Sequence, residues 1–170
     1  MEYLQIEECL RSMVILVDTR EQPSERARKR YNAFSFPWRR QKLDYGDYSA
    51  AFVLNDSEIQ IKAAIERKMN LEELSSCFTQ SRDRFKREFE RAKQDNASVY
   101  LLVENANWEK LLAGHYNTRF NANAFKASII AWMARYDLKP IFCRSEVSGQ
   151  LIQEILYREL KERLERGDYD

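Results

Sequence analysis

The sequence predicts an α/β fold in which a mixed β-sheet carries helices on both faces. Short apolar runs with the composition of buried strands alternate with longer segments whose apolar residues recur at helical spacing. In the second half of the chain, each such strand is followed by a helix before the next strand begins. This order is typical of right-handed crossovers within a mixed or parallel sheet.

The first half of the chain is expected to consist mostly of strands. Residues 13–19, MVILVDT, are an apolar run that ends in polar residues, as a buried strand does. The basic segment that follows is expected to be a loop or an irregular turn, because Pro23 and Pro37 oppose regular structure. Residues 43–54 and 58–68 are expected to pair as a hairpin around the turn at residues 55–57.

The second half is expected to be mainly helical, with strands between the helices. Asn70 is a favourable N-cap, and Glu73 stands at the third helical position, as in a capping box. The expected elements are a helix over residues 71–93, a strand over 98–104, a short helix ending at Gly114, a helix over 121–137, a strand over 139–143 and a final amphipathic helix capped by Ser148.

Length and composition indicate a soluble globular protein. The 170 residues suit a single domain, residues 1–170, with 44% hydrophobic and 32% charged residues. No apolar run approaches the roughly 18–20 residues that span a bilayer, and the N-terminus has no secretion signal, so no membrane association is expected. Three widely spaced cysteines and one histidine do not form a zinc pattern. Free thiols in an intracellular protein are expected, in the cytoplasm or nucleoid if the source is a prokaryote or phage and in the nucleus if it is a eukaryote.

One segment of the chain is unusually basic. Residues 26–42 contain seven basic residues, four aromatic residues and no acidic residue. A run of like charge is usually a solvated surface. Such a segment also suits a nucleic acid, because cations attract phosphates and aromatic rings stack on exposed bases. Charge alone leaves both interpretations open.

Acidic and basic residues converge near one end of the expected hairpin. Glu66 and Lys68 are two positions apart on the second strand and share one face, whereas Arg67 lies on the other. Asp47 opens the first strand and is expected to lie beside that end. Asp18, at the end of the first apolar run, is a candidate third carboxylate.

This combination of residues has a chemical interpretation. Converging carboxylates repel each other unless a cation neutralises them, and hard oxygen ligands suit Mg²⁺ or Mn²⁺. Such an ion polarises a phosphate oxygen and activates a bound water, while a lysine can hold the water or stabilise charge on the phosphorane. The pattern therefore fits phosphodiester hydrolysis. A surface hairpin with an ordinary ion pair, worth roughly 0–1 kcal/mol, fits the same spacing.

The ordered motifs resemble those of the XPF family of structure-specific endonucleases. The matching stretches are VDTRE at 17–21, LDYGDY at 43–48 and IERK at 65–68. The family's nuclease motif is written GD…ERK-x-x-x-D. Glu72 stands where the motif ends in Asp, and the neighbouring Glu73 is an alternative for that role.

The resemblance covers about residues 13–160 and implies a restriction-endonuclease-like core. It implies that Asp47 and Glu66 are metal ligands, that Lys68 is the catalytic lysine and that Asp18 assists at the metal. Arg67 would tie a helix or the VDTRE segment in place. The other residues expected at the site are Arg20, Glu21 and Glu72 as support, and Arg39, Arg40, Lys42, Arg82 and Arg84 as contacts to DNA.

The expected function is that of a Mg²⁺- or Mn²⁺-dependent DNA endonuclease. Its substrates would be branched, flapped or forked DNA in repair, recombination or replication. Family members commonly carry a C-terminal helix-hairpin-helix pair, and nothing after residue 145 has the Gly-rich hairpins it requires. A stand-alone nuclease domain or a fragment is therefore expected, and a homodimer would match the family's habit. A non-catalytic junction-binding subunit and a resolvase or restriction-type nuclease remain alternatives.

Overall fold

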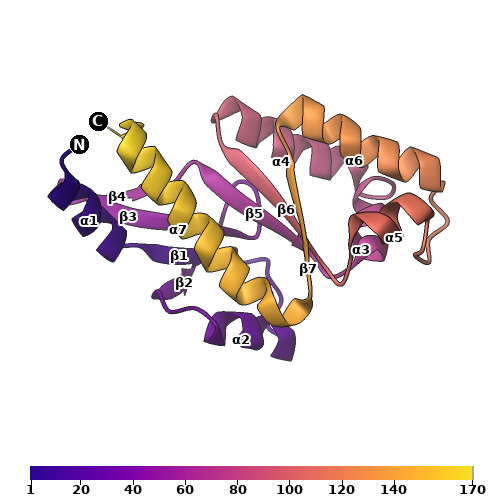
Figure 1. The fold of residues 1–170 in the computed structure, drawn as a ribbon, viewed down its shortest axis with the longest axis horizontal. Helices are drawn as coiled ribbons and strands as arrows, with labels where there is room; N and C mark the ends of the chain where they lie inside the picture. Colours follow the sequence, from indigo (N-terminus) through magenta and orange to yellow (C-terminus); the bar gives the residue numbers. More distant parts are fainter. Residues whose placement is uncertain (170) are drawn as a thin grey trace.

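A computed structural model describes residues 1–169 and shows a seven-stranded mixed sheet with helices on both faces (Figure 1). The strands are β1 (Val14–Val17), β2 (Trp38–Arg40), β3 (Tyr48–Leu54), β4 (Ser57–Gln60), β5 (Ala63–Lys68), β6 (Ser98–Glu104) and β7 (Lys139–Cys143). Their order is β2-β1-β3-β5-β6-β7, with β4 paired to β3. Strand β3 is antiparallel to β1 and β5, whereas β5, β6 and β7 are mutually parallel. The α/β class expected from the sequence is confirmed.

The helices divide between the two faces of the sheet. On one face lie α1 (Tyr3–Arg11), α2 (Glu25–Asn32) and α7 (Ser148–Arg166), and on the other lie α3 (Leu71–Cys77), α4 (Arg82–Gln94), α5 (Trp108–Ala113) and α6 (Ala122–Tyr136). Figure 1 shows α7 crossing the half of the sheet that contains β1, β3 and β5, with the start of α1 and the end of α7 at the same end. No helix within residues 1–169 is long and apolar enough to cross a membrane.

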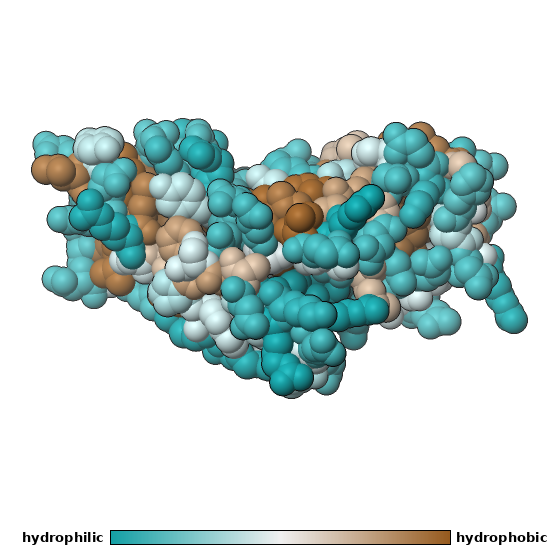
Figure 2. All heavy atoms as spheres, turned by 60° about the horizontal axis from the view of Figure 1, so that its bottom comes forward, coloured by the Kyte–Doolittle hydropathy of each residue, from teal (hydrophilic) through white to brown (hydrophobic). Residues whose placement is uncertain are grey.

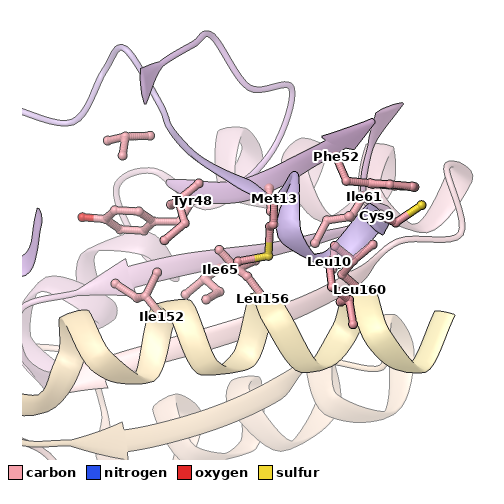
Figure 3. Close-up of a cluster of buried hydrophobic side chains, with 14 of the residues drawn as sticks. Cys9, Leu10, Met13, Tyr48, Phe52, Ile61, Ile65, Ile152, Leu156 and Leu160 are labelled. Atoms are coloured by element: carbon pink, nitrogen blue, oxygen red, sulfur yellow. The ribbon is translucent and has the colours of Figure 1, made fainter. Parts of the chain in front are cut away.

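The core beneath α7 is mainly aliphatic and closes one face of the sheet. Ile152, Leu156 and Leu160 recur at helical spacing on α7 and are fully buried. Figure 3 shows them pointing at the sheet, where they meet Ile65 of β5. The Tyr48 ring joins the same core, but its hydroxyl points away from the apolar cluster. A polar group thus lies at the edge of this core.

The core on the opposite face is aromatic. Trp132 of α6 stacks on Phe85 of α4 with ring centres 5.1 Å apart, and it meets Phe78 and Phe89 edge to face. The Lys68 ammonium lies 5.6 Å from the centre of the Phe85 ring. This face of the sheet therefore holds both the aromatic core and the end of β5.

The second strand of the expected hairpin is divided into β4 and β5. The turn at Asn55 and Asp56 has positive φ at both residues, which these two residue types tolerate in a tight hairpin. Strand β4 stays paired to β3, while β5 leaves β3 after one register pair, Tyr48 with Ile65, and pairs along its length with β6. The division allows β5 to join the two halves of the sheet.

The expected helix over residues 71–93 is two helices. Its apolar stripe lacks a member one turn after Phe78, where Ser81 and Arg82 stand, and the chain turns there between α3 and α4. The N-terminal prediction is confirmed, because the Asn70 side chain accepts a hydrogen bond from the Glu73 amide at 2.8 Å.

The basic segment is not a loop, as the sequence analysis expected. It contains α2, which Ser24 caps by accepting a hydrogen bond from the Ala27 amide, and the short parallel strand β2. The helix at Tyr3–Arg11 was not expected either. Ser148 is also not an N-cap: a 3₁₀ turn precedes α7, and the Ser148 hydroxyl donates to the Ser145 carbonyl inside that turn.

Candidate active site

Asp47 is placed by the loop that leads into β3. The preceding Gly46 has φ +74°, and a Cβ there would lie 2.8 Å from the Ala64 Cβ, so the loop approaches β5 closely. The Asp47 amide donates to the Ile65 carbonyl at 2.8 Å, and its carbonyl accepts from the Asp18 amide at 2.8 Å. The backbone of Asp47 therefore joins β1 to β5.

Glu66 and Lys68 project from β5 on the face of the aromatic core, as strand alternation predicted. They form a salt bridge with each other, and each residue is less than a tenth exposed. The backbone amide between them, that of Arg67, donates to Asp47 Oδ2 at 2.8 Å. Asp47, Glu66 and Lys68 are therefore brought together, and we refer to them as the carboxylate–lysine cluster.

The cluster has more negative than positive charge. Burial and the charge of Glu66 raise the pKa of Asp47 to about 7, against the smaller lowering effects of Lys68 and the Arg67 amide. Burial alone would lower the pKa of Lys68, but the charges of Glu66 and Asp47 outweigh it and raise that pKa. Lys68 therefore stays charged near neutral pH, and one further cation would neutralise the carboxylates.

Asp18 lies beside this cluster with both carboxylate oxygens already occupied. Oδ1 accepts from the amide and Nε of Arg20, and Oδ2 accepts from Arg20 Nη2 and from the Leu43 amide. Burial raises the pKa of Asp18, but these hydrogen bonds outweigh it and hold the pKa below its ordinary value. In this arrangement Asp18 orients Arg20 and has no oxygen free for a metal ion.

Arg20 extends from Asp18 across to α4. Its Nη1 donates to Glu88 at 3.3 Å, while about half of its side chain remains exposed. Sequence analysis missed Glu88, which had the appearance of a surface charge on a mixed helix. The signal was present, because Glu88 stands among Phe85, Phe89 and Ala92 on the buried stripe of α4, and it is only 8% exposed.

A divalent metal fits the two carboxylates of the cluster. Asp47 is half-buried, and only one of its carboxylate oxygens accepts a hydrogen bond from residues 1–169. Asp47 and Glu66 offer the hard oxygen donors that Mg²⁺ and Mn²⁺ prefer, and Mg²⁺ sites often use one or two carboxylates with waters and phosphate. Across the described part of the chain, no three His, Cys, Asp or Glu side chains are grouped so as to hold a metal. The third ligand expected of Asp18 is therefore not in place.

The acidic residues after ERK do not join the cluster. Glu72, in the first turn of α3, accepts a hydrogen bond from the Asn117 amide at 2.9 Å. Glu73 accepts from the Met69 amide at 2.6 Å, next to the helix cap. Both carboxylates therefore support the start of α3 and the loop docked against it.

Glu21 and Arg67 lie on the other face of the sheet. There they meet Arg30 of α2, Tyr48 of β3 and Glu104 of β6 in a set of mutual contacts, which we call the buried polar network. Arg67 Nε lies 3.8 Å from Glu21 Oε1, which agrees with the expectation that Arg67 ties the VDTRE segment in place. Sequence analysis missed the other three members, and it counted Arg30 among the surface charges of the basic segment.

The residues expected to contact DNA differ in how free they are. Arg39 forms a salt bridge with Glu58, Arg40 donates to the carbonyls of Thr19 and Glu21, and Arg82 donates to the Phe78 carbonyl. Lys42 and Arg84 are exposed and have no hydrogen bond or ion pair with other described residues. The expected free thiols are confirmed at Cys9, Cys77 and Cys143.

Comparisons with known proteins agree with this geometry. Residues 17–155 match the ERCC4 domain family. Among solved structures, XPF from Aeropyrum pernix is similar at a TM-score of 0.58 and 19% identity, covering 84% of this chain and 59% of that one. The same protein in complex with DNA gives a TM-score of 0.60 at 19% identity, covering 89% of this chain and 66% of that one.

These likenesses establish the family and the fold. The chain spans about three fifths to two thirds of the length of the solved XPF chains, and at 19% identity their likeness shows the fold alone. No curated protein is significantly similar to the chain in sequence. The resemblance of the GD…ERK motif to the XPF family is confirmed by the family match, which covers more than half of the chain. The chain belongs to the ERCC4 domain family.

Proposed function

We propose that the protein is a Mg²⁺- or Mn²⁺-dependent endodeoxyribonuclease that hydrolyses phosphodiester bonds. The observation that carries the proposal is the carboxylate–lysine cluster, in which two buried or half-buried carboxylates have one lysine between them, while the nearby Arg20 is already paired with Asp18 and Glu88. A structural ion pair would need only Glu66 and Lys68. Asp47 is fixed beside them by the Arg67 amide at 2.8 Å, and its carboxylate adds a negative charge that a metal ion would balance.

The residues of the cluster have separate roles in this proposal. Held by Asp47 and Glu66, the divalent ion would polarise a phosphate oxygen and activate a bound water. Lys68 is charged, so it would stabilise negative charge on the phosphate rather than accept a proton. Glu66 keeps the Lys68 ammonium in place through their salt bridge. Arg20, held by Asp18 and Glu88, offers a half-exposed guanidinium to an adjacent phosphate.

Two basic rims flank the cluster and are proposed to bind the DNA backbone. On α4, Arg84 and Arg87 share a flank with Arg91, because the three are spaced by three and four positions. Arg91 donates to the Asp44 carbonyl in the loop before Asp47, so this flank faces the site. Within residues 1–169, Arg84 and Arg87 have no acidic partner, which leaves their charges available for phosphates.

The second rim is the exposed side of α2. The Arg26 guanidinium contacts the sulfur of Met69, the residue that follows Lys68, so α2 lies beside the end of β5. Figure 2 turns this side toward the viewer and shows it largely hydrophilic. Arg28 is exposed on the same helix and is unpaired among the described residues. The rims would thus hold phosphates on both sides of the bond that is cut.

Branched, flapped or forked DNA is the substrate class we propose. Family membership supports it, and one of the similar solved structures is a complex with DNA. The same reasoning makes a repair, recombination or replication role, an intracellular location and a homodimer parts of the proposal. Leu112 of α5 and Ile130 of α6 are half exposed and would be available to a second copy.

The decisive experiment separates cleavage from binding. The protein is incubated with labelled flap, fork, four-way junction and plain duplex DNA in Mg²⁺, Mn²⁺ or chelator. We expect cleavage with either metal, none with chelator, and a preference for flap or fork. Binding to these substrates without cleavage in either metal would favour a non-catalytic junction-binding subunit. Selective cutting of the four-way junction, or of the duplex, would favour a resolvase or restriction-type enzyme.

A further inference from the structure

The buried polar network gathers four charged groups and one hydroxyl from five segments of the chain. Glu21 follows β1, Arg30 lies on α2, Tyr48 begins β3, Arg67 is on β5 and Glu104 ends β6. All are buried except Arg67, whose side chain is 14% exposed. Two carboxylates face two guanidiniums, so the network is neutral as a whole. This balance is what a buried cluster of charges requires.

The contacts within the network are specific. Glu21 accepts from Arg30 and from the Tyr48 hydroxyl, and Arg30 Nε donates to that hydroxyl at 3.0 Å. Burial, together with the charge of Glu21, raises the pKa of Tyr48, so its hydroxyl stays protonated. The network therefore fixes the loop after β1 and helix α2 against the start of β3.

Glu104 is the deepest acid of the network and depends on Arg67. It is fully buried, and its one hydrogen bond from a side chain of residues 1–169 comes from Arg67 Nη1 to Oε2 at 3.2 Å. Its other oxygen, Oε1, lies 3.6 Å from Arg30 Nη1 and lacks a hydrogen-bond partner in the described chain, as does Arg67 Nε. Two incompletely paired groups thus adjoin each other at the end of β5.

Arg67 connects the network to the carboxylate–lysine cluster. Its side chain lies among the charges of the network on one face of the sheet. Its backbone amide donates to Asp47 Oδ2 on the other face, and its neighbours in sequence are Glu66 and Lys68. Any rotation of the β5 backbone that followed release of the Arg67 side chain would move all three members of the cluster.

We propose that Glu104 is a positioning residue of the active site, which acts by holding Arg67 so that the Arg67 amide and its two neighbours keep their geometry. The expected fall in kcat rests on the proposed nuclease function, whereas the expected change in the geometry of the Arg67 amide does not. Residues that support metal ligands from a second layer commonly change activity by about 10–100-fold when they are replaced.

The test compares two glutamate–arginine pairs in which one partner is buried and the other is only slightly exposed. Glu104→Gln keeps the size of the side chain and removes its charge. The matched control is Glu159→Gln on α7, where Glu159 pairs with the buried Arg163 at 3.0 Å, away from the cluster. We expect both variants to lower the melting temperature. Only Glu104→Gln should lower kcat, by about 10–100-fold with KM for DNA changed by less than about twofold.

Amide hydrogen exchange gives a readout that needs neither metal nor DNA. In Glu104→Gln, we expect exchange of the Arg67 amide to become faster by about tenfold or more, while the amides of Val99 and Leu101 on β6 keep their rates. In Glu159→Gln, the Arg67 amide should exchange as it does in the unchanged protein. If Glu104→Gln does not fold, Glu104→Asp keeps the charge but withdraws the carboxylate from Arg67 Nη1, and it should shift kcat and exchange in the same direction.

Two outcomes would overturn the proposal. One is unchanged exchange of the Arg67 amide in folded Glu104→Gln, or in Glu104→Asp. The other is an equal loss of kcat in Glu104→Gln and Glu159→Gln, which would mean that lost stability alone explains it. If the unchanged protein cuts no DNA, the proposed function fails, and the exchange measurement still decides the positioning role.

Discussion

The two faces of β5 differ in how their charged groups are balanced. On the face toward α2 and α7, Arg67 joins a network in which two acids and two guanidiniums balance each other. On the face toward α4, Glu66 and Asp47 share a single lysine, and the pKa of Asp47 is raised by burial and by Glu66. Because successive side chains of a strand point to opposite faces of the sheet, β5 has a charge-balanced group of residues on one face and a group with excess negative charge on the other. The balanced set stabilises the strand on which the unbalanced one depends.

The largest effect is expected from Asp47→Asn, which changes only the face of β5 with excess negative charge. It removes one carboxylate from the unbalanced face but keeps an oxygen that can accept from the Arg67 amide. We expect cleavage to fall by about 10³-fold or more, as loss of a metal ligand removes several kcal/mol of transition-state stabilisation. Labelled flap DNA would show the loss, and gel shift should show binding within about threefold, because no phosphate contact is removed. Full activity in this variant would place the chemistry elsewhere.

Removing a charged residue from the buried polar network should mainly lower the free energy of unfolding. Arg30→Met removes the guanidinium that pairs with Glu21 and lies 3.6 Å from Glu104 Oε1, and loss of one partner from a buried pair costs about 3–5 kcal/mol. We expect the free energy of unfolding in urea to drop by about that amount. Arg28→Met, on the exposed side of the same helix, is the control and should change it by less than about 0.5 kcal/mol. Equal effects would mean that the network is not a stabilising unit.

The raised pKa of Asp47 should lower the free energy of unfolding of the metal-free protein as pH rises. A carboxyl whose pKa is higher in the folded than in the unfolded protein binds its proton more tightly when folded, so the free energy of unfolding falls as pH rises between the two values. For Asp47 this interval runs from about 4 to about 7. In chelator, we expect Asp47→Asn to be more stable than the unchanged protein at pH 8 by about 1–2 kcal/mol, since partial exposure screens the effect. Near pH 4 the difference should vanish.

Urea unfolding at several pH values measures this difference. Addition of Mg²⁺ should stabilise the unchanged protein at pH 8 and leave Asp47→Asn nearly unaffected. Parallel pH curves for the two proteins would show that Asp47 titrates normally, and the excess negative charge of the cluster would then be in doubt.

The smallest effects are expected at the rims of the site. Replacing Arg84 and Arg87 with alanine should weaken DNA binding slightly and reduce the slope of log affinity against log salt by about 0.9 for each lost phosphate contact on duplex. Arg39→Ala is the matched comparison, because Arg39 already pairs with Glu58. Fluorescence anisotropy at several salt concentrations gives the slopes. An equal or larger change for Arg39→Ala would support the original expectation that the segment around β2 binds DNA.

The sequence was sufficient for those features that depend on local periodicity. Alternation along a strand placed Glu66 and Lys68 on one face and Arg67 on the other, and helical spacing identified most of the core. It was insufficient where a partner lies far along the chain. Arg39 and its partner Glu58 are 19 positions apart, and nothing local distinguishes a paired arginine from a free one. Glu88 was missed because charge was given more weight than its place in an apolar stripe.

The contact between Gly46 and Ala64 makes the width of the site adjustable. Two of the smallest residues meet where the loop bearing Asp47 approaches the strand bearing Glu66. An added carbon at either position would push the loop and the strand apart, and at Gly46, with φ +74°, it would also strain the backbone. A library restricted to these two positions would vary the separation of the carboxylates without replacing any charged residue. It would therefore test whether the proposed preference for Mg²⁺ or Mn²⁺ depends on that separation.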